Sequence, residues 1–178
     1  MKKIHTNIFK DKSCFLSAGD TVLLTGEIYT ARDQAHKKLV DLLSSGRKLP
    51  LDITGKIIYY CGPTATPKGK VIGSCGPTTS RRMDKFVEPL LANGLVAMIG
   101  KGRRAPDVIK AVKKYQAVYL LAPAGCGALL AERVTAKELI AFKELGPEAI
   151  YKLTVDDFPL IVGVDSSGRD IYDKIYFK

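Results

Sequence analysis

The chain has 178 residues and a net charge of +10, from 28 Lys and Arg against 18 Asp and Glu. The length suits a single domain over residues 1–178, and the sequence has neither an apolar leader nor a membrane-spanning run, which favours a soluble, cytoplasmic protein. The positive charge favours an anionic partner, so nucleic acid, a membrane surface and small acids all stay open.

The first part of the chain alternates predicted strands and helices. We expect strands near 3–7 and over 21–30, and a helix over about 32–45. A further strand over 56–61 ends at Gly62-Pro63-Thr64, which predicts a turn. Arg32 therefore lies where a strand passes into a helix. His36, on that helix, has the pattern of an ordinary surface histidine.

The most informative stretch runs from Gly73 to Asp84 and reads Gly-Ser-Cys-Gly-Pro-Thr-Thr-Ser-Arg-Arg-Met-Asp. We expect a short buried strand over 70–72 before it, and an apolar face of helical period predicts a helix after it. Glycines that permit close backbone approach and helix N–H groups without partners both favour an anion here. Arginine at the positive end of a helix also favours an anionic ligand over simple capping by Thr79 or Ser80.

The second half continues the alternation. Strands are expected over 95–99 and 117–122, with helices over about 105–115 and 128–133. Lys101 lies between two glycines directly before the first of these helices, and Arg103 and Arg104 are expected to be surface charges. Towards the C-terminus we expect a helix near 147–150, strands near 151–155, 160–165 and 171–177, and turns at 156–159 and 165–168.

Four cysteines, Cys14, Cys61, Cys75 and Cys126, lie far apart in the sequence and form no Cys-x-x-Cys pair. A disulfide framework is not expected for a cytoplasmic chain. A zinc site or an iron–sulfur cluster built wholly from this chain is not expected either. We expect buried or loop thiols without a metal.

Three basic residues, Arg32, Arg82 and Lys101, each occupy a predicted junction between a strand and a helix. If the strands are parallel, these side chains meet at the carboxyl edge of the sheet, where open α/β sheets bind ligands. A dicarboxylate fits two arginine forks and one lysine. A nucleic-acid-binding module and a non-catalytic anion-binding domain remain alternatives, although aromatic residues are few and no nucleic-acid-binding motif is present.

The segment 76–84, Gly-Pro-Thr-Thr-Ser-Arg-Arg-Met-Asp, resembles the G-P-T-T-x-x-R-M-D signature of class I iron–sulfur fumarate hydratases and L-tartrate dehydratases, in their β subunit or C-terminal domain. Arg32-Asp33-Gln34-Ala35-His36 is similar to an R-D-x-A-H element of the same domain. Cys126 departs from the small residue expected in the family's Gly-rich turn, and its role stays open. The resemblance covers nearly the whole chain and implies an α/β fold, a three-layer β/β/α swivelling-type domain with a central parallel sheet and additional antiparallel strands.

The resemblance also implies a reaction, the reversible hydration of a dicarboxylate such as fumarate to (S)-malate. A [4Fe-4S] cluster would be carried by the α partner subunit of a higher heteromer and not ligated by this chain, which would be active only with that partner. Arg32, Arg82, Lys101 and Gly76 would bind the substrate, and Thr78 would be the catalytic base. Fumarate, tartrate and other dicarboxylates share the carboxylates that the arginines would bind, so the sequence does not distinguish them.

Overall fold

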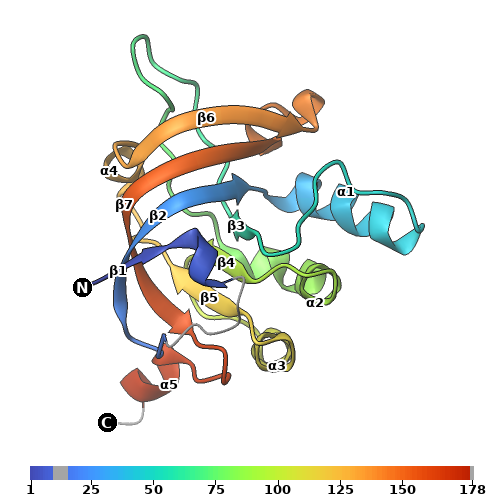
Figure 1. The fold of residues 1–178 in the computed structure, drawn as a ribbon, viewed down its shortest axis with the longest axis vertical. Coiled ribbons are helices and arrows are strands. Elements are labelled where there is room, and N and C mark those ends of the chain that lie inside the picture. Colours follow the sequence, from blue (N-terminus) through green and yellow to red (C-terminus); the bar gives the residue numbers. More distant parts are fainter. Residues whose placement is uncertain (10–15, 177–178) are drawn as a thin grey trace.

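A computed structural model describes residues 1–9 and 16–176, and Cys14 lies outside them. Within these residues the strands form one seven-stranded sheet in the order β1-β2-β3-β4-β5-β7-β6 (Figure 1). The strands are β1 (Lys2–His5), β2 (Thr21–Thr30), β3 (Ile57–Tyr59), β4 (Ala97–Gly100), β5 (Val118–Leu121), β6 (Val134–Ala141) and β7 (Ile150–Val164).

The helices are α1 (Asp33–Ser44), α2 (Asp84–Ala92), α3 (Pro106–Tyr115), α4 (Gly127–Ala131) and α5 (Ile171–Tyr176). Short 3-10 segments are η1 (Thr6–Phe9), η2 (Ser80–Met83) and η3 (Lys143–Glu148). Among the described residues, no helix has the length and apolar character needed to cross a membrane.

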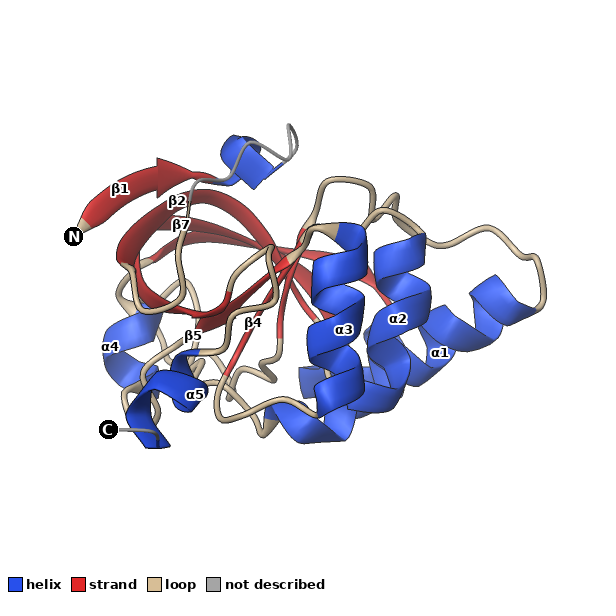
Figure 2. Ribbon diagram, turned by 90° about the horizontal axis from the view of Figure 1, so that it is seen from below, coloured by secondary structure: helices blue, strands red, loops and turns tan. Residues whose placement is uncertain are grey.

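The sheet has a parallel part and an antiparallel part, as the family resemblance implies. Strands β1 to β5 run parallel to their neighbours, whereas β7 is antiparallel to β2, β5 and β6. Because β7 pairs with both β2 and β5, the strands β2, β3, β4, β5 and β7 close into a ring, and Figure 2 shows this curvature. The three helices α1, α2 and α3 lie side by side beside the parallel strands (Figure 2).

Successive residues of the parallel strands point into two different apolar clusters. Ile57, Tyr59, Ala97 and Ile99 belong to one cluster with residues of β7. Their neighbours Ile58 and Met98 belong to the other, with residues of α1, α2 and α3. This alternation follows from the two-residue period of a strand, and burial on both faces explains why these strands read as continuous apolar runs.

The predictions for Thr21–Thr30 and for the helix near 105–115 are confirmed, but the predicted strand over 70–72 is wrong. That segment is part of the loop between β3 and η2, and Val71 is 43% exposed. The neighbouring strand edges are already occupied, because β3 pairs with both β2 and β4. The apolar residues Val71 and Ile72 therefore have no free edge of β3 to pair with.

The C-terminal predictions also need correction. The segment 156–159 is no turn between two strands: it lies within β7, and a bulge opposite β2 accommodates Asp157, which has φ 47°. Residues 171–176 form helix α5 and not a strand. Asp170 Oδ1 accepts a 3.0 Å hydrogen bond from the Tyr172 N–H, as a residue that starts a helix does. Strand β6 is not anticipated from the sequence.

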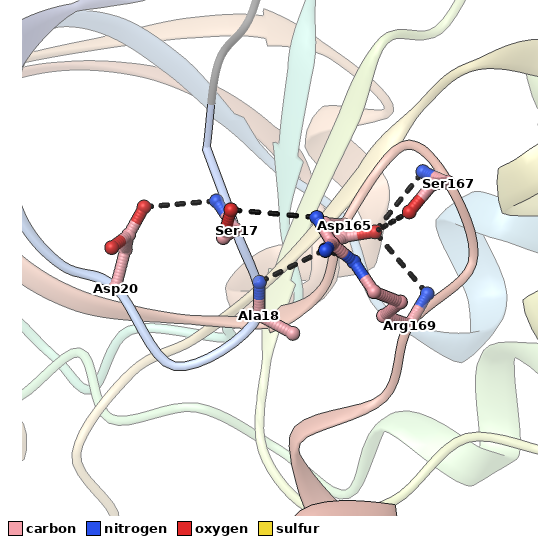
Figure 3. A network of polar contacts seen from close by, with 6 residues as sticks. All are labelled: Ser17, Ala18, Asp20, Asp165, Ser167 and Arg169. Carbon is pink, nitrogen blue, oxygen red and sulfur yellow. Dashed lines mark hydrogen bonds and ion pairs between the residues drawn. The ribbon is translucent and has the colours of Figure 1, made fainter.

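The predicted turn at 165–168 is confirmed, and a buried carboxylate, Asp165, holds it (Figure 3). Its Oδ2 accepts hydrogen bonds from the Ala18 N–H at 3.0 Å and from Arg169 Nε at 2.8 Å. Its Oδ1 accepts from the Ser167 hydroxyl at 2.6 Å. Burial alone raises the pKa of Asp165, but these hydrogen bonds outweigh burial and lower it. The carboxylate therefore serves the fold, by joining the segment before β2 to the end of β7.

Candidate functional site

The candidate site lies at the carboxyl ends of β2, β3 and β4. These strands are parallel, so Arg32, which follows β2, and Lys101, which follows β4, reach the same edge of the sheet. The loop that carries Thr78 is held at this edge by backbone pairing. The Thr78 N–H donates to the Tyr60 carbonyl at 2.7 Å, and Thr79 forms a parallel bridge with Lys101. Arg32 and Lys101 therefore lie at this edge as predicted, whereas Arg82 lies in η2 after the motif loop and not after a strand.

Ser80 fixes the first turn of the motif against the end of β4. Its buried hydroxyl oxygen accepts hydrogen bonds from the Lys101 N–H at 2.8 Å and from the Tyr119 hydroxyl at 2.9 Å. A Cβ at Gly100 would lie 1.9 Å from this oxygen, so only glycine fits there. Thr79 occupies the N-cap position of η2, as the sequence allows for Thr79 or Ser80, but its side chain makes no capping hydrogen bond.

Arg82 contacts two groups that the sequence does not place together. Its Nη2 atom donates to Thr78 Oγ1 at 2.8 Å and lies 3.0 Å from Asp33 Oδ2. The same Asp33 oxygen is 4.0 Å from Arg32 Nη2. Asp33 begins α1 and Arg82 lies in η2, so one carboxylate joins two segments that are distant in the sequence. Thr78, Arg82 and Arg32 thus form one cluster.

Arg32 lies deeper than Arg82 and leaves a donor unpaired. Its Nη2 is 3.8 Å from Glu148 Oε1, and its side chain is 27% exposed. Its Nε is buried without a hydrogen-bond partner among the described residues. The side chain lies across Gly62, where a Cβ would come within 2.9 Å of Arg32 Nη1. An unpaired guanidinium N–H in this position suits an incoming carboxylate.

Lys101 and Gly76 border this cluster in different ways. Lys101 is half-buried, and no ion pair engages its ammonium group within the described residues. Gly76 faces Gly127 at the start of α4, because a Cβ on Gly76 would lie 3.4 Å from Gly127 Cα. The Cys75 N–H also donates to the Gly127 carbonyl at 3.1 Å. Gly76 therefore permits the close packing of the motif loop on the Gly-rich turn, where Cys126 is half-buried.

Arg104 is not the surface charge that the sequence suggests. Its side chain is fully buried, and its Nε donates to Asp84 Oδ1 at 2.8 Å. Its guanidinium lies 4.7 Å from the ring centre of Tyr119 and 5.3 Å from that of Tyr60. Burial lowers the pKa of Arg104, but Tyr60, Tyr119 and Asp84 raise it more, so the group stays charged. Asp84, the last residue of the motif, is thus paired with a buried arginine. Arg103 is exposed, as predicted.

His36 is fully buried, so its predicted surface position is wrong. Its Nδ1 lies 2.9 Å from the Arg32 carbonyl oxygen, and its ring packs edge-on against Tyr60. Burial lowers the pKa of His36 to about 4. The imidazole is therefore neutral near pH 7, and Nδ1 carries the hydrogen because a carbonyl only accepts. His36 thereby fixes the backbone of Arg32, whose guanidinium belongs to the site.

Cys61 and Cys75 are far apart in the sequence but adjacent in space. Their thiols share a hydrogen bond, which together with burial raises the pKa of Cys61. In the part of the chain that the structure describes, no three His, Cys, Asp or Glu side chains form a group that could hold a metal ion. These residues therefore do not fit an iron–sulfur cluster, which is commonly held by four thiolates.

Asp33 and Glu148 also belong to the site, although neither was predicted from the sequence. Asp33 reads from the sequence as an ordinary acid in the first turn of a helix. Its place beside Arg32 in the R-D-x-A-H element was the available signal. Glu148 carries no such signal, because it lies more than a hundred residues away in a segment without a motif. It reaches the site at the end of η3, where it also accepts a 3.0 Å hydrogen bond from the Gln34 N–H.

Comparisons with known proteins cover almost the whole chain. A family model described as fumarase C-terminus matches residues 2–175. A Methanocaldococcus jannaschii protein, provisionally named L(+)-tartrate dehydratase subunit beta, is 44% identical over 166 residues, which cover 90% of this chain and 85% of that protein. The L(+)-tartrate dehydratase subunit beta of Escherichia coli is 36% identical over 177 residues, covering 96% and 87%.

A class I fumarate hydratase is also similar, over a smaller part of its own length. The anaerobic enzyme of Escherichia coli is 43% identical over 157 residues, which cover 87% of this chain but 29% of the enzyme. The chain therefore spans most of the β subunits and less than a third of the fumarate hydratase.

Proposed function

Since the chain belongs to the fumarase C-terminus family, we propose that it is the β chain of a hydro-lyase that adds water reversibly to a dicarboxylate. The first reaction to test is the conversion of fumarate to (S)-malate, and the second is the dehydration of L-tartrate, because similar proteins carry both names. The observation that carries this proposal is the cluster of Thr78, Arg82 and Arg32 at the carboxyl edge of the sheet.

The two arginines suit the two ends of a dicarboxylate. Arg82 comes from the motif and Arg32 from the start of α1, so each guanidinium takes one carboxylate with a planar fork. A charge-assisted hydrogen bond of this kind contributes about 1.5–3 kcal/mol. Lys101, held beside Thr79, adds a positive point charge at the edge of the cluster. Gly76 lets the loop approach closely enough to present these groups.

Thr78 is the group proposed to move the substrate proton. In the dehydration direction its Oγ1 takes the proton from the substrate carbon beside a carboxylate, and in the hydration direction it returns that proton. A free threonine hydroxyl is a very weak base, so its deprotonated form needs a nearby cation. The hydrogen bond from Arg82 Nη2 to Thr78 Oγ1 supplies that cation at 2.8 Å.

The remaining machinery is assigned to a partner. The proposal places a [4Fe-4S] cluster on an α subunit in a cytoplasmic heteromer. The names of the similar β subunits support a second subunit. The proposal includes a three-layer β/β/α domain of the swivelling type, supported by the layer of α1, α2 and α3 on the parallel strands and by the antiparallel pair β6 and β7.

The test is an anaerobic assay of the chain mixed with its cluster-loaded α partner, with fumarate and L-tartrate as alternative substrates. Formation of malate or oxaloacetate that requires both proteins supports the proposal. Dicarboxylate binding without turnover of either acid would instead make the chain a non-catalytic anion-binding domain.

A further inference from the structure

Asp33 forms an ion pair with Arg82, an arginine that the proposed substrate needs. Its Oδ2 lies 3.0 Å from Arg82 Nη2, the same nitrogen that donates to Thr78. Glu148, the other acid of the cluster, lies 3.8 Å from Arg32, and among the described residues it makes no ion pair with Arg82. The two acids therefore differ in position, although both lie at the same edge of the sheet.

The shape of a guanidinium makes the Asp33 contact important. A carboxylate binds arginine with two parallel hydrogen bonds, either across Nη1 and Nη2 or across Nε and Nη2. Both modes use Nη2. In Arg82 this atom already has the Thr78 hydroxyl and an Asp33 oxygen within 3.0 Å. Nη2 has two N–H bonds, one for each fork, and Thr78 Oγ1 accepts a hydrogen bond from one of them, so a substrate carboxylate that takes the fork on the Asp33 side meets a carboxylate of the same charge.

The surroundings give Asp33 room to move. Its side chain is 32% exposed and that of Arg82 is 48% exposed. Both residues line an open cleft of about 440 Å³ beside Asp84 and Lys85. Thr78, by contrast, is fixed through its backbone bond to Tyr60. Of the two groups on Nη2, Asp33 is the one that borders this cleft.

We propose that Asp33 is a positioning residue that holds Arg82 in the ligand-free protein and is displaced by a carboxylate of the substrate. This inference rests on the proposed function, since it takes a dicarboxylate as the ligand. Asp33 keeps the guanidinium beside Thr78 while the site is empty, and it weakens substrate binding by competition. When a substrate carboxylate replaces the Asp33 carboxylate, one negative charge next to Arg82 is exchanged for another.

The test compares Asp33→Asn with a matched control, Glu148→Gln. Asparagine keeps the shape and an acceptor oxygen but loses the charge, and Glu148→Gln removes the same charge from the acid that does not touch Arg82. Dissociation constants for fumarate and for acetate, a bare carboxylate, are measured by NMR titration of the Arg82 side-chain signals. Asp33→Asn is expected to tighten binding of both acids roughly two- to fivefold, the range for a partly exposed ion pair. Glu148→Gln is expected to change the binding less.

The outcomes separate this inference from the proposed function. Unchanged or weaker binding in Asp33→Asn, or equal tightening in Glu148→Gln, overturns the competition by Asp33 whatever the chain catalyses. Tighter acetate binding in Asp33→Asn without any fumarate binding retains the role of Asp33 and contradicts the dicarboxylate function. If neither acid shifts the Arg82 signals in any variant, both conclusions fail.

Discussion

The hydroxyl of Thr78 accepts a 2.8 Å hydrogen bond from the guanidinium of Arg82, four residues further along the chain. The proposed base and the proposed carboxylate ligand are therefore in direct contact. A substrate carboxylate bound to Arg82 would lie within a few ångströms of the oxygen that takes the proton. Kinetic measurements can distinguish the two residues. Replacement of Thr78 should affect the chemical step, and replacement of Arg82 should affect substrate binding as well.

Thr78→Ala is predicted to lower kcat strongly and to leave KM nearly unchanged, since it removes an interaction needed for the chemical step. Thr78→Ser, which retains the hydroxyl, serves as the matched control and should keep most of the activity. The measurement is steady-state kinetics of the chain reconstituted with its partner. A rise in KM alone for Thr78→Ala would make Thr78 a positioning hydroxyl.

Arg82→Lys is predicted to keep the fold and lose most turnover. Lysine retains the charge but cannot present a planar fork to a carboxylate. Loss of one partner of a charge pair typically costs about 2–5 kcal/mol, or roughly 30- to several-thousand-fold in kcat/KM. Circular dichroism checks the fold and steady-state kinetics measure the loss. Kinetics close to those of the unmodified chain would remove Arg82 from the site.

Arg104→Met is predicted to destabilise the chain by about 3–5 kcal/mol, because it leaves a largely buried carboxylate without its cation. That carboxylate is Asp84, whose side chain is 12% exposed. Arg81→Met is the control, because Arg81 is exposed and its replacement should change stability by no more than about 0.5 kcal/mol. Urea unfolding measures both. Equal stability of the two variants would contradict the structural role of Arg104.

His36 should make stability fall as the pH falls below its ordinary pKa. Its pKa is 6.5 in the unfolded reference and about 4 in the folded chain, because of burial. Between these values the unfolded chain binds a proton that the folded chain does not, so the free energy of unfolding decreases towards low pH. The full effect is about 3 kcal/mol. Urea unfolding at several pH values should show this slope and show a flatter one for His36→Asn; identical slopes would contradict the account.

Much of the fold follows from local sequence patterns. The strands β4 and β5 are buried on both faces, and such burial produces the apolar runs that mark 95–99 and 117–122. Thr21–Thr30 instead alternates between buried and less buried residues over its first half, as a strand with one covered face does. The helix after the motif follows from its apolar face, which buries Met83, Val87 and Leu90. Two basic residues of the candidate site could be placed because Arg32 and Lys101 follow the ends of the parallel strands β2 and β4, whereas Arg82 follows no strand and reaches the site on the motif loop.

The parts that the sequence did not predict depend on distant partners. Arg104 is buried because Asp84, Tyr60 and Tyr119 come together around it from separate segments. Cys61 and Cys75 meet because the loop between β3 and η2 turns back on itself. No local sequence pattern indicates such contacts between distant segments. The helix at 171–176 also escaped prediction, since its start depends on the carboxylate of Asp170.

We propose that this chain supplies carboxylate binding and proton transfer to a site that a partner completes. The most direct test is the anaerobic rate of malate formation from fumarate, with L-tartrate dehydration as the parallel assay. The rate is measured for this chain alone, for the cluster-loaded α partner alone, and for the two together. Activity is expected only in the mixture, and it should be lost on exposure to air. Oxygen-stable hydratase activity from this chain alone would contradict the proposal.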